Sequence, residues 1–149
     1  MIEGLAVRSL LGRLAVEWAD RAEVCEADEP PGWVEIVPRN PRAACLRIDY
    51  EPDGGEEVWV GIFVEHEQPG IPAFSEEWEV GTLEDLEALV RAVAAGDVQA
   101  RFGPGRQMVE VHLADGTVDG STGYDFPVGC LPLPGWRRRA EVVRFEAYT

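Results

Sequence analysis

The sequence predicts an α+β fold in which two helices pack on a curved, antiparallel sheet of about seven to eight strands. Two observations carry this prediction. Apolar residues recur at helical spacing in two segments only, and much of the remaining chain consists of short apolar or alternating runs separated by glycine, proline and aspartate. Strands joined by such short turns are antiparallel. The length of 149 residues is typical of one domain, so residues 1–149 are expected to form a single domain with one core.

The first segment with helical spacing lies at the N-terminus. Its regularly spaced apolar residues are Val7, Leu11, Leu14 and Trp18. Steps of four, three and four residues place these side chains on one face, which predicts an amphipathic helix from about Glu3 to Arg21. The two prolines in the run at residues 28–32 each remove a backbone donor, so we expect the helix to end before that run.

The second segment begins at Thr82. The Thr-Leu-Glu-Asp sequence that starts there resembles a capping box with aspartate in place of glutamate. The apolar residues that follow at helical spacing are Leu83, Leu86, Val90 and Val93. Gly96 is typical of the residue that follows a helix, so we expect the second helix to end there.

The strand-like runs fall into two groups, one on each side of the second helix. They are residues 33–37, 44–50, 57–64 with an extension towards 67, and 74–80, followed by 98–102, 107–114, part of 117–126, and 140–148. An Asp-Gly-Gly turn at residues 53–55 is expected to join two strands as a hairpin. The segment 127–135 is rich in proline and glycine and is expected to be a surface loop.

The composition bears on the compartment. No stretch approaches the roughly 18 consecutive apolar residues of a membrane helix, and the N-terminus does not have the pattern of a signal peptide. The three cysteines, Cys25, Cys45 and Cys130, include no Cys-x-x-Cys pair, which favours idle thiols in a reducing compartment and predicts no metal and no cofactor. All thirteen basic residues are arginine, a bias typical of GC-rich bacterial genomes. We therefore expect a bacterial, cytoplasmic protein.

The net charge of −15 is concentrated in one part of the chain. Residues 1–100 hold 22 acidic residues and 7 arginines, whereas residues 101–149 hold six of each. Between Arg47 and Arg91 there are thirteen acidic residues and no basic one. Such a charge attracts basic proteins and repels nucleic acid and anionic membranes. It predicts a basic protein partner, and the alternative is a solvated face that keeps the protein soluble.

Glu65, His66 and Glu67 place a possible metal ligand between two carboxylates. Successive side chains of a strand point to opposite faces, so His66 is separated from its neighbours if the strand continues this far. No second group of His, Cys or Asp lies nearby in the sequence, and no metal site is predicted. Glu65 and Glu67 would share a face about 7 Å apart, a separation also found between the paired carboxylates of hydrolases.

Two other titratable residues are candidates for a site. Glu76 would share a strand face with Phe74 and Trp78, where a carboxylate needs a partner; an arginine from residues 137–139 could supply it, and a bulge that turns Glu76 outward is the alternative. His112 would share the outer face of its strand with Glu110 as an exposed pair. No serine or cysteine lies in a pattern typical of nucleophilic catalysis.

The arginines at 137–139 form the one basic cluster of the sequence. A nucleic-acid surface needs a wider basic patch, so we expect these arginines to pair with acidic residues of the same chain. The Gly-Pro-Gly-Arg sequence at residues 103–106 does not contain the Gly-Lys-Ser/Thr of a phosphate loop and predicts a turn.

The segment from Leu83 to Phe102 (LEDLEALVRAVAAGDVQARF), followed by strands that carry Asp115 and Gly116, resembles small uncharacterised actinobacterial proteins. Many chains of that design look like immunity proteins of bacterial polymorphic toxin systems. The resemblance implies a small, acidic, cytoplasmic α+β protein that neutralises a basic toxin, often a nuclease, by covering its active site. It implies no catalytic residues.

The first hypothesis is therefore a non-enzymatic protein of the immunity or antitoxin type, which binds a basic protein. The residues expected to bind this partner are Glu65, Glu67, Glu76, Glu77 and Glu79, with Trp78 as an aromatic anchor if its ring is exposed.

Two alternatives stay open. A small-ligand-binding protein or a hydrolase-type enzyme would use a concave sheet face, with Glu76 and either His66 or His112 in one pocket. A structural homodimer subunit would expose an apolar patch, for which Leu131 and Leu133 are candidates.

Overall fold

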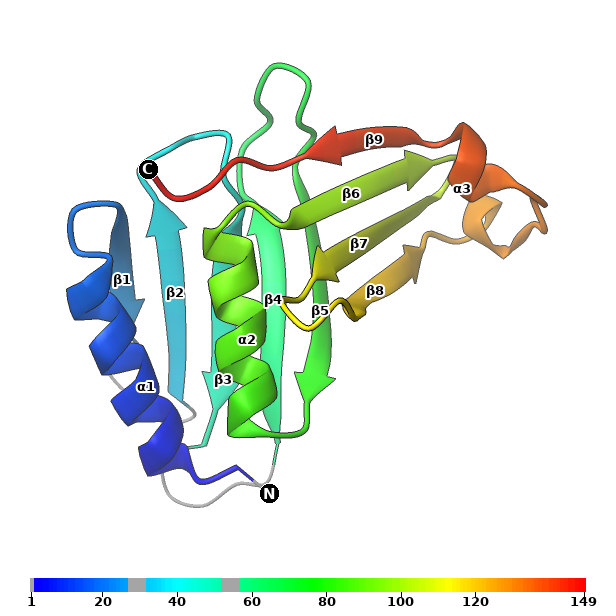
Figure 1. Cartoon of the computed structure of the whole chain (residues 1–149). Coiled ribbons are helices and arrows are strands. Elements are labelled where there is room, and N and C mark those ends of the chain that lie inside the picture. The colour runs from blue at the N-terminus through cyan, green and yellow to red at the C-terminus, as the bar shows by residue number, and fades with distance from the viewer. Residues whose placement is uncertain (1, 27–31, 52–56) are drawn as a thin grey trace.

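A computed structural model describes residues 2–26, 32–51 and 57–149 of the chain (Figure 1). Within these residues the protein has three α-helices and nine strands, all paired antiparallel. The predicted α+β class and the antiparallel pairing are confirmed. The prediction of one curved sheet of seven to eight strands is wrong, because the strands form a five-stranded sheet in the order β1-β2-β3-β4-β5 and a four-stranded sheet in the order β8-β7-β6-β9.

The elements follow one another as two halves that each begin with a helix. The first half is α1 (Gly4–Glu17), β1 (Ala22–Glu26), β2 (Gly32–Pro38), β3 (Cys45–Tyr50), β4 (Val58–Val64) and β5 (Phe74–Val80). The second is α2 (Leu83–Ala94), β6 (Val98–Gly103), β7 (Arg106–His112), β8 (Val118–Tyr124), a 3-10 turn at Val128–Cys130, α3 (Trp136–Arg139) and β9 (Glu141–Arg144). Among the described residues, none of these helices has the length and apolarity needed to cross a bilayer.

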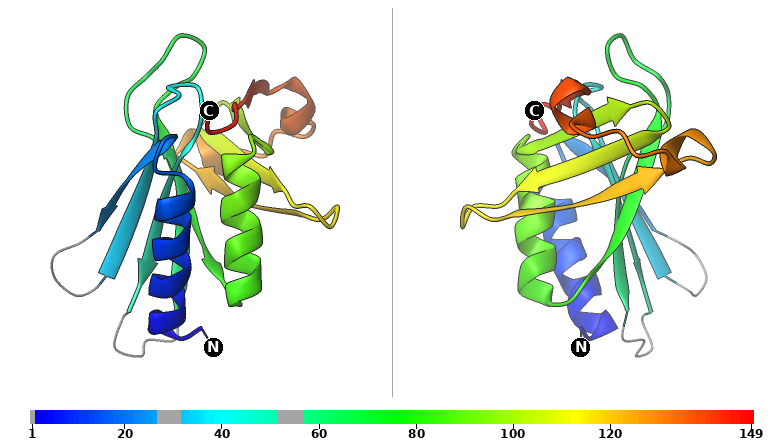
Figure 2. Two further views of the ribbon diagram at one scale, coloured as in Figure 1. Left: turned by 60° about the vertical axis from the view of Figure 1, so that its left-hand side comes forward. Right: turned by 90° about the vertical axis from the view of Figure 1, so that its right-hand side faces the viewer.

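Both long helices cover the same face of the five-stranded sheet, and the four-stranded sheet packs on that side near β5 (Figures 1 and 2). Phe74 of β5 joins the two sheets, with its ring 5.5 Å from that of Phe102 on β6 and 5.8 Å from that of Phe145. The alternate residues of β2, β3 and β4 that face the helices are fully buried. The opposite face of this sheet is covered by no described segment.

Both predicted helices form, and α2 has nearly the predicted bounds. The hydroxyl of Thr82 accepts a hydrogen bond from the backbone N–H of Asp85 at 3.1 Å, as expected for an N-cap, and Gly96 follows the helix with a φ of 81°. Helix α1 ends at Glu17 rather than Arg21. The chain turns there and forms β1, which the sequence analysis missed because this short edge strand alternates over five residues only.

Three predicted segments differ from the structure or lie outside it. Strand β4 ends at Val64, so the predicted extension to residue 67 is wrong and residues 65–67 belong to the following loop. The turn predicted at residues 53–55 lies outside the described residues. The loop predicted at 127–135 is present and contains the short 3-10 turn.

The C-terminal segment was predicted as a strand over residues 140–148, but only Glu141–Arg144 pair as one. The chain then enters the core between the end of α2 and the β2–β3 connection. Tyr148 is almost fully buried, its ring lies edge-on to Trp18 at 5.7 Å, and its hydroxyl donates to the carbonyl of Ala44 at 2.8 Å. Its backbone N–H donates to the carbonyl of Ala94, at the end of α2, at 2.8 Å rather than to a neighbouring strand.

Candidate functional site

The face of the five-stranded sheet that points away from the helices, called the open face below, carries an unusual mixture of side chains. Alternation along each strand puts the following residues on it: Glu23, Cys25, Trp33, Glu35, Val37, Cys45, Arg47, Asp49, Trp59, Gly61, Phe63, Ser75, Glu77 and Glu79. Aromatic rings thus stand among acidic side chains, and the set contains a single cation.

The strand register arranges these side chains in rows across the sheet. One row runs Trp33, Asp49, Trp59 and Glu79, so that indole rings and carboxylates alternate. The next row runs Cys25, Glu35, Arg47, Gly61 and Glu77. Side chains opposite one another on neighbouring strands are about 5 Å apart at Cβ, so Asp49 and Glu79 border an indole ring and Glu35 borders the arginine.

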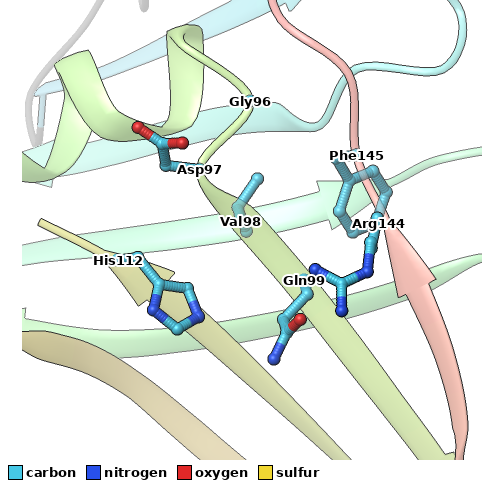
Figure 3. Close-up of a pocket in the computed structure, with 7 residues that line it drawn as sticks. All are labelled: Gly96, Asp97, Val98, Gln99, His112, Arg144 and Phe145. Atoms are coloured by element: carbon cyan, nitrogen blue, oxygen red, sulfur yellow. The ribbon is translucent and has the colours of Figure 1, made fainter.

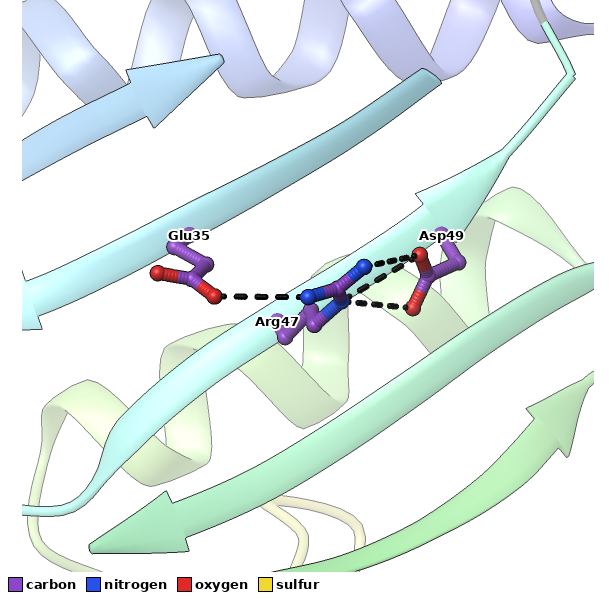
Figure 4. A network of polar contacts seen from close by, with 3 residues as sticks. All are labelled: Glu35, Arg47 and Asp49. Atoms are coloured by element: carbon purple, nitrogen blue, oxygen red, sulfur yellow. Dashed lines mark hydrogen bonds and ion pairs between the residues drawn. The ribbon is translucent and has the colours of Figure 1, made fainter. Parts of the chain in front are cut away.

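The single cation is held by the face itself (Figure 4). The guanidinium of Arg47 donates to both carboxylate oxygens of Asp49 at 3.1–3.2 Å and approaches Glu35 at 3.5 Å. It also stacks over Trp33, 5.1 Å from the ring centre. The hydrogen bond to Asp49, together with the negative charges of Asp49, Glu35 and Glu77, raises the pKa of Arg47. Its charge is therefore matched within the face.

Glu77 and Glu79 lie on the open face, as exposed side chains of β5. Within the described residues neither makes an ion pair or a side-chain hydrogen bond. Glu65 and Glu67 are exposed in the loop that follows β4, at the end of the same sheet. Four of the acids expected to bind a partner are thus open to solvent.

Glu76 and Trp78 point to the opposite side of β5, because alternate residues of a strand face opposite ways. Glu76 lies between the two sheets and accepts hydrogen bonds from Gln107 Nε2 at 2.8 Å and Ser121 Oγ at 3.2 Å. These neutral groups, rather than an arginine from residues 137–139, are its partners. Trp78 packs against the core, and its indole N–H is buried without a hydrogen-bond partner among the described residues, so it does not present an exposed anchor.

A small hollow lies beside the open face where β3 and β4 meet the loop at residues 65–68. Its volume is about 160 Å³, and its lining includes Cys45, Val64, Glu65 and His66. Burial of the thiol, with the nearby carboxylates of Glu65 and Glu35, raises the pKa of Cys45 from 9.0 to about 11. The loop acid Glu65 thus acts electrostatically on the open face.

This pKa predicts slow alkylation of Cys45. At pH 8 the thiolate fraction of a group with a pKa of about 11 is about a hundredfold below that of a cysteine with a pKa of 9.0. Mass spectrometry of iodoacetamide-treated protein should therefore show Cys45 modified far more slowly than the exposed Cys25 and Cys130. Replacing Glu65 with glutamine should speed the reaction at Cys45. Equal rates at the three cysteines would contradict the prediction.

A second hollow, of about 390 Å³, lies on the four-stranded sheet and includes Asp97, Gln99, His112 and Arg144 in its lining (Figure 3). The carboxylate of Asp97 points away from the imidazole of His112. His112 lies 4.0 Å from Glu110, which also accepts from Gln99 at 3.3 Å and Arg101 at 3.0 Å. His112 lies beside Glu110 as the sequence analysis expected, but of the two only His112 is exposed, because the Glu110 side chain is 20% exposed. The hollow contains no acid and base aimed at a common point.

The three residues that an enzymatic site would need do not come together. His66 and His112 line different hollows, and Glu76 lines neither. No group of three or more His, Cys, Asp or Glu side chains in the described part of the chain could hold a metal ion.

The arginines at 137–139 and Arg106 differ from expectation. Within the described residues none of the arginines at 137–139 forms an ion pair with an acidic residue. Arg139 instead donates a hydrogen bond to the carbonyl of Pro134 at 3.0 Å. Arg106 is buried and donates to the carbonyls of Pro104, Val128 and Leu131. The sequence analysis saw only a turn there, because no local pattern marks a buried arginine.

Comparison with known proteins finds no match. No protein-family model fits the chain, and no curated protein and no solved structure is significantly similar to it. The resemblance to immunity proteins therefore stays a prediction, and function must be argued from the residues of the open face.

Proposed function

We propose that this chain is a non-enzymatic binding protein that engages a basic protein partner through the open face. The observation that carries the proposal is the alternation of indole rings, of which that of Trp59 is exposed, with acidic side chains on a sheet face that no described segment covers. Aromatic rings provide large contact areas at little entropic cost, and carboxylates steer a basic surface towards them. Glu77 and Glu79, which form no ion pair with any described residue, provide this charge beside Trp59.

The aromatic rings argue against a role in solubility alone. A face that serves only to keep the protein in solution needs charge, and exposed indole rings work against that purpose. Trp59 is 37% exposed, and Trp33 and Phe63 are half-buried on the same face. Aromatic residues are enriched at recognition surfaces, and acidic side chains among them favour a basic partner.

The biological role that fits this proposal is that of an immunity-type protein that neutralises a basic toxin in the cytoplasm. The net charge of −15 opposes binding to nucleic acid or to an anionic membrane, and it speeds encounter with a positively charged domain. A reducing compartment of this kind would keep Cys25, Cys45 and Cys130 as free thiols. No cofactor is needed for such a role.

The test compares three tagged versions of the protein in affinity purifications from its host's lysate. The face variant carries Glu77→Arg and Glu79→Arg, and the matched control carries Glu84→Arg and Glu141→Arg, which make the same change in net charge at exposed sites off the open face. Wild type and control should retain a basic protein at low salt and lose it at high salt, since charge attraction is screened. The face variant should retain about tenfold less.

Either of two results would overturn the proposal. A basic protein retained equally by the face variant would show that binding occurs elsewhere. If no co-purified protein is retained at low salt and lost at high salt, the acidic face has no basic partner in the lysate. That result would favour a ligand-binding role.

A homodimer subunit is the second candidate, favoured by an apolar patch on the segment after β8. Phe126 is 86% exposed and Leu131 is 58% exposed, with Tyr124 and Val128 exposed beside them, whereas Leu133 is half-buried. Exposed apolar side chains gathered in one segment are typical of an interface.

A further inference from the structure

A second surface of the molecule combines exposed apolar side chains with positive charge. It is formed by residues 124–139, called the tip below, which lie beyond the outer ends of β6, β7 and β8 and away from the five-stranded sheet (Figure 1). Three exposed arginines stand at residues 137–139, and Asp125 is the one acid of this stretch, so the tip is basic. Its large exposed apolar residues are Tyr124, Phe126, Val128 and Leu131.

The apolar residues of the tip are gathered around one buried side chain. Arg106 donates to the carbonyls of Val128 and Leu131, at 3.1 and 2.7 Å. Its guanidinium also lies 5.7 Å from the ring centre of Tyr124. Because one group reaches all three residues, their side chains form a patch rather than a scattered series. A surface that is already ordered loses little conformational entropy when it binds.

The positive charge of the tip adjoins this patch and is open to solvent. The guanidinium of Arg137 lies 5.7 Å from the ring centre of Trp136, whose other face neighbour is the buried Arg106, also at 5.7 Å. None of the three arginines at 137–139 forms an ion pair with an acid among the described residues. Their charge is therefore available to a partner.

The tip and the open face are complementary in charge, and both carry exposed apolar area. The open face presents the exposed indole of Trp59 beside Glu77 and Glu79, which form no ion pair with any described residue. The tip presents apolar side chains beside arginines. Apolar contact combined with opposite charges is typical of protein–protein interfaces.

The two surfaces of one molecule point in different directions. The open face points away from the helices, whereas the four-stranded sheet that carries the tip packs on the helix side of the five-stranded sheet (Figures 1 and 2). The tip of one molecule therefore does not cover its own open face, and both surfaces are available to other copies.

A second copy is favoured over nucleic acid or a membrane as the occupant of the tip. The net charge of −15 repels both of these anionic partners. The same charge repels another copy at long range. At 0.15 M salt, however, exposed charges more than about 8 Å apart are largely screened, whereas charges in direct contact still attract. A weak association between copies is expected.

We propose that the protein associates with itself head to tail, with the tip of one copy docked on the open face of the next. This inference rests on the open face being the binding surface of the proposed function, and it adds a second occupant that competes with the basic partner. The contact differs from a twofold homodimer, in which the apolar patches of two copies would face each other. A head-to-tail contact leaves one tip and one open face free, so it continues into longer chains unless it closes into a ring.

The test uses analytical ultracentrifugation of the full-length protein and three variants at 0.15 M salt. The face variant carries Glu77→Arg and Glu79→Arg, and the tip variant carries Arg137→Glu and Arg138→Glu. The matched control carries Arg8→Glu and Arg13→Glu, which make the same change in net charge as the tip variant at exposed sites of α1. The dispersion of the amide NMR spectrum reports whether each variant keeps its fold.

Wild type and control should increase in average mass with concentration, up to about 1 mM, which is high enough to populate a weak contact. The face variant and the tip variant should each associate at least about tenfold more weakly, because each places like charges opposite one another.

An equal mixture of the face variant and the tip variant gives the most specific result. The face variant keeps a wild-type tip, and the tip variant keeps a wild-type open face. The mixture should therefore form a one-to-one complex although neither variant associates alone. A twofold contact between apolar patches predicts the opposite, because the face variant would then associate like wild type.

Three results would show that the inference is wrong: a wild-type protein that stays monomeric, a face variant that associates like wild type, or a mixture of folded variants that stays monomeric. The proposed function would stand in each case if the affinity purification recovers a basic protein that the face variant loses. If self-association follows the expected pattern but no basic protein is recovered, the inference stands and the proposed function is wrong.

Discussion

Replacing Tyr148 with alanine is expected to lower the free energy of unfolding by about 3 to 5 kcal/mol. The ring is among the largest fully enclosed side chains of the protein and lies edge-on to Trp18 at 5.7 Å. Its removal leaves a cavity between the end of α2 and the β2–β3 connection, and it also leaves the carbonyl of Ala44 without its donor. Urea denaturation of the two proteins measures the difference.

The conservative variant Tyr148→Phe separates packing from hydrogen bonding. It keeps the ring and should cost about 1 to 2 kcal/mol. Burial raises the pKa of Tyr148 above its ordinary value of 10.0, so the wild-type protein should lose stability as the pH rises above 10, where the unfolded chain ionises, and the Phe variant should lose less. An alanine variant within 1 kcal/mol of wild type would show that the C-terminal segment is not part of the core.

Local periodicity was sufficient to predict most elements but not how the strands divide. Both helices and seven of the strands lie where apolar spacing and turns place them, because helical and strand periods act over a few residues. The division into two sheets depends on β6 pairing with β9 rather than with β5, and this choice is made by distant contacts such as those of Phe74. Tyr148 ends the last strand early through similar distant contacts.

The candidate site was predicted in part, for the same reason. The acidic run along β5 is visible in the sequence, and alternation puts Glu77 and Glu79 on one face while Glu76 faces the other. Which of these faces lies open depends on where the helices pack. The aromatic and acidic side chains of β2 and β3 lie on the same face as Glu77 and Glu79 only because of the strand register. No short sequence motif encodes that register.

Arg106 illustrates the same limit for a structural residue. Its side chain is 6% exposed and donates to Pro104 at 3.0 Å, Val128 at 3.1 Å and Leu131 at 2.7 Å, in each case to the carbonyl oxygen. The guanidinium also lies 5.7 Å from the ring centres of both Tyr124 and Trp136. One side chain thus holds together both ends of the segment that carries the exposed apolar patch.

Replacing Arg106 with alanine should therefore release the segment at residues 127–139 without unfolding the rest of the protein. Three carbonyls lose a charged donor, and each such hydrogen bond contributes about 1.5 to 3 kcal/mol. Local opening should become more frequent, and trypsin should cleave after the arginines at 137–139 at least about a hundredfold faster. Peptide mapping over time measures this rate.

Two controls test the cause of the faster cleavage. One asks whether it requires loss of the guanidinium donors of Arg106, and the other asks whether it is specific to this position. Arg106→Lys keeps the charge but cannot reach three carbonyls in one plane, so its cleavage rate should lie between those of wild type and the alanine variant. Arg13→Ala removes an exposed arginine of α1 and should leave the rate unchanged. If Arg106→Ala is cleaved no faster than Arg13→Ala, other contacts hold the segment. If cleavage rises as expected and any self-association is lost with it, the apolar patch on this segment is the dimer contact.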